Sequence, residues 1–111
     1  MNEKSEYMVM RIREALKPWK VDITEKRMFG GYCFLYKGKM CVGETKHRLM
    51  ARVISDEMNK ALAMPHVKPM DFTGKPLKEF VFVTEDGFDT EAKLQHWIEL
   101  GIAHAKSKVN G

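Results

Sequence analysis

The chain has 111 residues, of which 44% are hydrophobic and 31% charged, a balance typical of one soluble domain over residues 1–111. Lys and Arg outnumber Asp and Glu by 19 to 15, and the net charge of +4 permits contact with nucleic acid without requiring it. No apolar run approaches the ~20 residues that span a bilayer, and the polar N-terminus does not resemble a secretory signal. We therefore expect a cytoplasmic protein without a membrane contact.

The first predicted element is a helix from Ser5 to Lys17, which Pro18 ends because proline disfavours the helical conformation of the residue before it. Its apolar residues recur at the spacing of one helix face: Met8, Ile12, Ala15 and Leu16. Arg13, Lys17 and Lys20 form a basic stripe on the polar side. This stripe is either a contact surface for nucleic acid or a protein partner, or an ordinary solvated helix face.

Four consecutive strands with short connections are predicted next, which indicates an antiparallel meander. The first strand spans Val21 to Met28 and the fourth spans Arg48 to Val53. Between them, aromatic side chains at mostly alternating positions indicate strands with one buried face: Phe29, Tyr32, Phe34 and Tyr36. Gly30 and Gly31 predict a corner or bulge. The alternative is a phosphate site, which normally needs a following helix, whereas here a strand follows.

A second turn is predicted between Tyr36 and Lys39. A three-residue loop with Gly38 in the left-handed conformation would pair Cys33 with Cys41, and a two-residue loop would pair Phe34 with Cys41. We expect the three-residue loop, because Lys-Gly lacks the Asn or Asp that favours the shorter turn. That loop would gather four core residues on one face: Tyr32, Phe34, Met40 and Val42. The two cysteines are either small buried residues or a redox pair facing each other across this hairpin.

A short second helix is predicted from Ser55 or Asp56, either of which can cap it, through Leu62. From Pro65 to Pro76 the chain reads as an irregular loop, because it contains three prolines and a glycine. A loop of this length in a compact domain can be functional, so it is a candidate ligand or substrate site.

A fifth strand is predicted over Leu77 to Thr84, followed by a last helix that Asp89 or Thr90 caps. The apolar stripe of this helix consists of Leu94, Trp97, Ile98, Gly101 and Ala105. Gly101 costs about 1 kcal/mol relative to alanine in a helix, which indicates a close approach of the helix to the sheet. The sequence thus predicts an α+β fold of order α-β-β-β-β-α-β-α, with about five antiparallel strands and the helices on one side.

No catalytic motif occurs in the sequence: it lacks a nucleophile elbow, a phosphate-binding loop, a zinc-protease helix and a dinucleotide fingerprint. The four histidines are far apart in sequence: His47, His66, His96 and His104. His96 and Glu99 are one helical turn apart and could share a metal only with two further ligands, so a surface pair is the simpler interpretation. We expect no metal, no cofactor and no catalytic residue.

The ordered motifs of the chain resemble the TfoX/Sxy N-terminal domain family. The resemblance rests on Arg27-Met28-Phe29-Gly30-Gly31, Gly38 followed by Lys39-Met40, the pair Pro69-Met70 and a closing helix with Trp97. It covers residues 21–105. Relatives carry a second, helical C-terminal domain, and we expect this chain, which ends at Gly111, to be a stand-alone N-terminal domain.

The resemblance implies a regulatory domain connected with transcriptional control of natural competence, acting together with other regulators. We therefore expect a non-catalytic domain that acts through a protein partner, with self-association through a sheet edge as one form of that contact. Two alternatives remain open. One is a small ligand-binding protein or enzyme that uses the loop at residues 65–76, and the other is weak nucleic-acid binding through the basic stripe.

Overall fold

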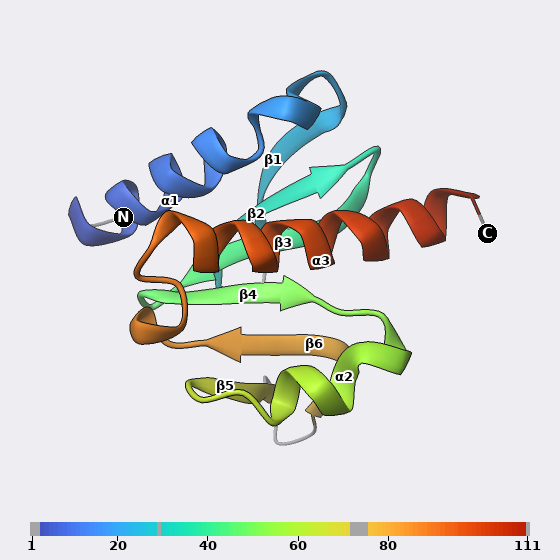
Figure 1. Cartoon of the computed structure of the whole chain (residues 1–111). Helices are drawn as coiled ribbons and strands as arrows, with labels where there is room; N and C mark the ends of the chain where they lie inside the picture. The colour runs from blue at the N-terminus through green and yellow to red at the C-terminus, as the bar shows by residue number, and fades with distance from the viewer. Residues whose placement is uncertain (1–2, 29, 72–75, 111) are drawn as a thin grey trace.

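A computed structural model describes residues 3–28, 30–71 and 76–110. In this part of the chain, six antiparallel strands form one sheet of order β1-β2-β3-β4-β6-β5, and three α-helices cover one of its faces (Figure 1). The helices are α1 (Glu3–Ala15), α2 (Ser55–Leu62) and α3 (Glu91–Asn110), with short 3-10 turns η1 (Lys17–Asp22) and η2 (Glu85–Gly87). The strands are β1 (Ile23–Met28), β2 (Gly31–Tyr36), β3 (Lys39–Thr45), β4 (Arg48–Arg52), β5 (Val67–Asp71) and β6 (Pro76–Val83). The predicted α+β class is confirmed.

The sheet carries apolar side chains on both faces. The larger core lies under the helices, where Phe34 and Val42 of the sheet pack in one cluster with Trp97 of α3. The opposite face holds a second buried cluster, which consists of Cys33, Met40, Met50, Met70, Phe80 and Phe82. No helix in the described residues is long and apolar enough to cross a membrane.

The turn between β2 and β3 is the two-residue turn, so the expected three-residue loop is wrong. Lys37 and Gly38 both have positive φ, 48° and 83°, and Tyr36 pairs directly with Lys39. This is the backbone that matches the twist of a hairpin, and Lys37 adopts it although Asn or Asp is preferred there.

A β-bulge then shifts the register of the same hairpin. Leu35 pairs with Met40, whereas Phe34 pairs with Val42, so Cys41 is the extra residue. Both predicted cysteine pairings are therefore wrong, because Cys33 lies opposite Gly43. The bulge also corrects the predicted core face: Met40 belongs to the second cluster, away from the helices.

Part of the predicted irregular loop is an edge strand. β5 pairs with β6 through Pro69 opposite Val81, in a segment where sequence alone indicated no regular structure. A proline is tolerated there because an edge strand needs hydrogen-bond donors on one side only. Pro65 and His66 form a turn before β5, Pro76 begins β6, and residues 72–75 of that loop lie outside the described residues.

The helix caps predicted from the sequence are confirmed for α3 but not for α2. The Thr90 side chain caps α3, since its hydroxyl oxygen accepts the Lys93 N–H at 3.2 Å. The predicted cap of α2 is wrong: Ile54 is the capping residue and makes no side-chain bond. Instead, Oε2 of Glu79 accepts the Ser55 backbone N–H at 3.2 Å and the Ser55 hydroxyl at 2.9 Å. A carboxylate from another element thus supports the N-terminus of α2.

The close approach of α3 to the sheet is confirmed at Gly101. A Cβ at this position would lie 2.5 Å from the carbonyl oxygen of Cys41 and 2.9 Å from Cγ1 of Val42. Gly101 is therefore required by packing against β3, and this contact offsets its low helix propensity.

Candidate functional site

The predicted basic stripe lies in a groove between the C-terminal end of α1, η1 and β1. Arg13, Lys17 and Lys20 all line this groove, whose volume is about 310 Å³. Its apolar lining comes from Leu16, Ile23 and Phe34. We call it the basic groove. It gives the stripe an apolar floor, which a solvated helix face alone would lack.

Two of the three stripe cations are already paired. The Arg13 guanidinium donates two hydrogen bonds to the Glu25 carboxylate, at 2.8 and 2.7 Å, and the Tyr32 hydroxyl donates a third at 2.6 Å. This bonding lowers the pKa of Glu25 and raises that of Arg13. Lys17 lies 3.0 Å from Glu14. Lys20 has no ion-pair partner in the described residues, so little of the stripe is left for phosphate contacts.

A second groove lies where the C-terminal end of α2, η2 and the first turns of α3 meet. Its volume is about 450 Å³, and it is lined by Met64, Pro65, His66, Asp86, Gly87, Ala92, Lys93, His96 and Trp97. We call it the α2–α3 groove. Met64 lies at its border with 38% of its surface exposed, and Lys93 is held by Asp89 at 2.9 Å. The surface of the groove is mainly apolar, although polar side chains also line it, and it includes the start of the predicted loop.

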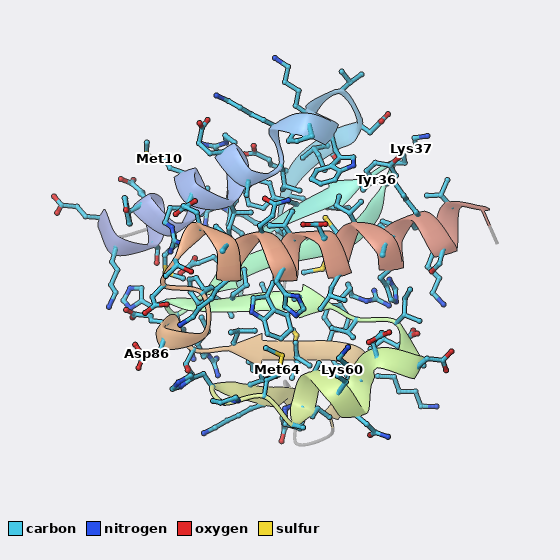
Figure 2. The ribbon with its side chains drawn as sticks, in the orientation of Figure 1. Met10, Tyr36, Lys37, Lys60, Met64 and Asp86 are labelled. Atoms are coloured by element: carbon cyan, nitrogen blue, oxygen red, sulfur yellow. The ribbon has the colours of Figure 1, made fainter. Side chains whose placement is uncertain are left out.

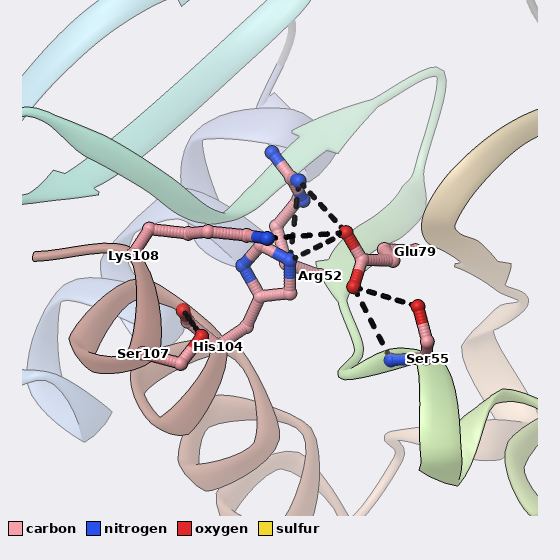
Figure 3. A network of polar contacts seen from close by, with 6 residues as sticks. All are labelled: Arg52, Ser55, Glu79, His104, Ser107 and Lys108. Carbon is pink, nitrogen blue, oxygen red and sulfur yellow. Dashed lines mark hydrogen bonds and ion pairs between the residues drawn. The ribbon is translucent and has the colours of Figure 1, made fainter. Parts of the chain in front are cut away.

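A polar cluster that sequence reasoning missed joins four elements of the fold (Figure 3). Nε2 of His104 in α3 lies 3.3 Å from Oε1 of Glu79 in β6 and 3.1 Å from Nη2 of Arg52 in β4. Lys108 approaches the same Oε1 at 3.7 Å, and Ser55 of α2 binds the other carboxylate oxygen. Glu79 has a φ of 61°, which is unusual for a residue with a side chain.

The surroundings of this cluster shift the pKa values of Glu79 and His104. The Ser55 hydrogen bond, His104 and Lys108 lower the pKa of Glu79 to about 2. Burial and the charge of Arg52 lower the pKa of His104, and Glu79 acts in the opposite direction. In the described residues, Nδ1 of His104 and Nε of Arg52 have no hydrogen-bond partner. His104 is only 1% exposed, so the cluster is closed to a substrate.

One sequence signal could have predicted that His104 is buried. It follows Trp97 and Gly101 at i+7 and i+3, which places it on the apolar stripe of the last helix. Arg52 and Glu79 gave no comparable signal, because charged residues are ordinarily exposed to solvent.

The environment of both cysteines disfavours the thiolate form. Both are free and buried, Cys33 in the second cluster and Cys41 in the core under the helices. Burial raises the pKa of Cys33 to about 11 and that of Cys41 to about 12. Among the described residues, no group of three His, Cys, Asp or Glu side chains could hold a metal ion.

A family model described as the TfoX N-terminal domain matches residues 14–105, which is most of the chain. The chain belongs to this family. A search of curated proteins found no match. The matched segment of this TfoX N-terminal domain runs from the end of α1 through most of α3, so it includes the α2–α3 groove and most residues of the basic groove and the polar cluster, but not Arg13 or Lys108.

The motif residues of the TfoX N-terminal domain serve its fold. Gly30 and Gly38 turn the chain with φ of 70° and 83°, and a Cβ on Gly31 would collide with the carbonyl oxygen of Glu44. Trp97 is 1% exposed, and its indole N–H donates a 3.0 Å bond to the carbonyl oxygen of Gly87. Met28, Pro69 and Met70 lie in β1 and β5, with Met70 fully buried, and Arg27 is exposed on β1. Phe29 lies outside the described residues.

Proposed function

We propose that this TfoX N-terminal domain is a non-catalytic regulatory domain that acts through contact with another protein. The observation that carries the proposal is the α2–α3 groove, an open apolar hollow bordered by the exposed side chain of Met64. Protein interfaces have an apolar centre and a polar rim, and exposed apolar surface commonly marks a binding site. Here the polar part of the lining comes from His66, Asp86, Lys93 and His96.

The burial of the reactive groups supports a non-catalytic role. A general base must reach the proton that it removes, and His104 is enclosed between α3, β4 and β6. A cysteine nucleophile acts as the thiolate, which the raised pKa values of Cys33 and Cys41 disfavour. The polar cluster therefore serves the fold in this proposal.

The family supports a regulatory role. Members of the TfoX/Sxy family are connected with transcriptional regulation of natural competence, so the proposed partner is another regulator. We place the contact in the cytoplasm, where the two thiols would remain reduced.

The test is site-specific photo-cross-linking in cells that express this chain. A benzophenone side chain replaces Met64, at the border of the groove, and in a matched control it replaces Met10, an exposed methionine of α1 that does not line the groove (Figure 2). We expect one discrete adduct with another protein from position 64 and none from position 10. The partner identified in this adduct should bind the purified domain in titration calorimetry, and Met64→Glu should weaken that binding at least tenfold.

Two outcomes would refute this proposal. One is that both positions give the same adducts or none. The other is that the identified partner binds the Met64→Glu variant as tightly as the original chain. Each outcome would remove the α2–α3 groove as the contact surface.

A small ligand is the second candidate, because pockets for small molecules are also apolar with a few polar groups. His66 and His96 line the α2–α3 groove together with Trp97 and would supply the polar contacts. A thermal-shift screen of small aromatic acids tests this role. A stabilising compound whose effect is lost in Met64→Glu would favour it over a protein partner.

A further inference from the structure

Strand β1 forms an open edge of the sheet. It pairs with β2 and, in the described residues, with no other strand. Its central residues, from Thr24 to Arg27, are all exposed. An edge of this kind presents backbone groups that can pair with a further strand.

The hydrogen-bond alternation identifies the backbone groups that point outward. Lys37 N–H donates to the Asp22 carbonyl oxygen at 2.8 Å, just before β1 begins. Hydrogen-bonded positions alternate along an antiparallel pair, so Thr24 and Lys26 also bond to β2. The N–H and C=O groups of Ile23, Glu25 and Arg27 are therefore directed away from the sheet.

The opposite edge is less suited to this use. β5 carries Pro69, which has no backbone N–H and is a common device for protecting an edge from strand addition. β1 contains no proline and spans Ile23–Met28. β1 therefore lacks this obstacle to an added strand.

The basic groove runs beside this edge on the helix side of the sheet. Ile23 and Glu25 of β1 line it together with Leu16, Lys17 and Lys20 of the α1–η1 segment. Successive side chains of a strand point to opposite faces of a sheet. Every second side chain of a strand added to β1 would thus be directed to the helix side, where the apolar floor of the groove can receive it.

The charge of this region selects the partner. Residues 13–28 contain five Lys and Arg residues against three Asp and Glu residues. In the described residues Lys20, Lys26 and Arg27 have no carboxylate partner, whereas Arg13 and Lys17 do. An acidic strand would complement these three cations, and a second copy of the chain would bring the same cations against one another.

We propose that β1 and the basic groove bind an extended acidic segment of a partner protein, which adds to the sheet as a further strand. Main-chain hydrogen bonds to Ile23, Glu25 and Arg27 supply affinity. Apolar side chains entering the basic groove, beside Lys20, and carboxylates facing Lys26 on the opposite side of the sheet supply specificity. This inference rests on the proposed protein-binding function but concerns another surface, so a failure at β1 and a failure at the α2–α3 groove are distinguishable.

The test uses the whole chain and fluorescein-labelled heptapeptides in which glutamate alternates with valine, leucine or phenylalanine. We expect at least one of them to bind, and peptides with lysine in place of glutamate not to bind. Lys20→Glu and Lys26→Glu should each weaken binding at least tenfold at low salt. Lys60→Glu, the same charge change on the exposed face of α2, should leave the affinity within twofold.

Amide hydrogen exchange measured by NMR tests the pairing itself. Bound peptide should slow exchange at the N–H groups of Ile23, Glu25 and Arg27 at least tenfold and leave Thr24 and Lys26 unchanged, since their N–H groups already bond to β2. Every second peptide residue can be N-methylated starting from either the first or the second residue. Only one of these two peptides should lose binding, namely the one whose methyl groups replace the N–H groups that face β1.

Three results would overturn the inference. The first is that no alternating peptide binds at 1 mM, which is about −4 kcal/mol of affinity. The second is that heptaglutamate binds as well, without slowed exchange, which would show charge attraction alone. The third is that duplex DNA binds more tightly than any peptide, with a steep salt dependence and the same sensitivity to Lys20→Glu, which would assign the surface to nucleic acid.

Discussion

His104 and Glu79 meet between α3 and β6, with Nε2 and Oε1 only 3.3 Å apart, although His104 is almost completely buried. The contact ties the last helix to β6, where Glu79 has positive φ and supports the N-terminus of α2. The stability of this arrangement therefore depends on the charge of both side chains.

Replacing Glu79 by Gln should destabilise the fold at neutral pH. The carboxylate accepts two bonds from Ser55 and faces His104 and Lys108, and hydrogen bonds to charged groups contribute about 2 kcal/mol. We expect a loss of about that size in the free energy of unfolding, measured with urea at pH 7. Glu99→Gln, on an exposed position of α3, is the matched control and should change little.

The pH dependence of stability should reflect Glu79 at the acidic end. Its pKa in the folded chain is about 2, below the ordinary value of 4.5, so folding favours the ionised form. The resulting stabilisation is complete above pH 4.5 and is lost as the pH falls toward 2. Urea midpoints between pH 6 and pH 2 should fall less in Glu79→Gln than in the original chain. If the urea midpoints of both chains fell by the same amount over this pH range, the assignment to Glu79 would be contradicted.

His104 should contribute in a separate pH window. Its pKa in the folded chain is lowered from 6.5, because burial and Arg52 disfavour the imidazolium, so the unfolded chain binds the proton first. Its stabilising effect is thus present above pH 6.5 and declines as the pH falls through that value. The difference in unfolding free energy between pH 7.5 and pH 5 should shrink in His104→Gln. His96 is exposed, so His96→Gln is the control and should show the same difference between the two pH values as the original chain.

Gly101→Ala should destabilise the chain in spite of the better helix propensity of alanine. A methyl group there would meet the Cys41 carbonyl oxygen at 2.5 Å, and overpacking of this kind costs about 2 kcal/mol. Helix propensity alone predicts a gain of about 1 kcal/mol. Thermal unfolding followed by circular dichroism distinguishes the two, and a melting temperature that stays or rises would show that α3 can move away from β3.

The native thiols should resist modification. Cys33 and Cys41 are fully buried with pKa values near 11 and 12, so at pH 8 neither should react with a disulfide reagent before the chain unfolds. Both should react in guanidinium. A thiol introduced by Ala103→Cys, on an exposed position of α3, should react within seconds and serves as the control. Rapid reaction of a native thiol would show that the sheet opens locally.

Local patterns predicted most of the fold. The spacing from Leu94 to Ala105 placed α3 correctly, and Thr90 caps it as a threonine before a helix commonly does. The signals that failed were weak or ambiguous in sequence. Lys37 does not favour positive φ by itself, and Pro69 argues against a strand unless the strand is known to lie at an edge.

The candidate sites were less accessible to sequence reasoning than the fold. The basic stripe was found by helical spacing, but its pairing with Glu25 arises because β1 returns beside α1. The α2–α3 groove joins Pro65 to Trp97, two residues with no shared local pattern. These residues are brought together only by the packing of helices and strands that are distant in sequence.

The sequence by itself determined the helices, five of the six antiparallel strands and the family, because periodicity, capping residues and glycine turns act over a few neighbouring residues. Only the tertiary structure decided the register of the β2–β3 hairpin, the edge position of β5 and the meeting of Arg52, Glu79 and His104. These features depend on which segments, distant in sequence, pack together and exclude water. Different packings compete for the same apolar surface, and no local pattern in the sequence shows which packing is most stable.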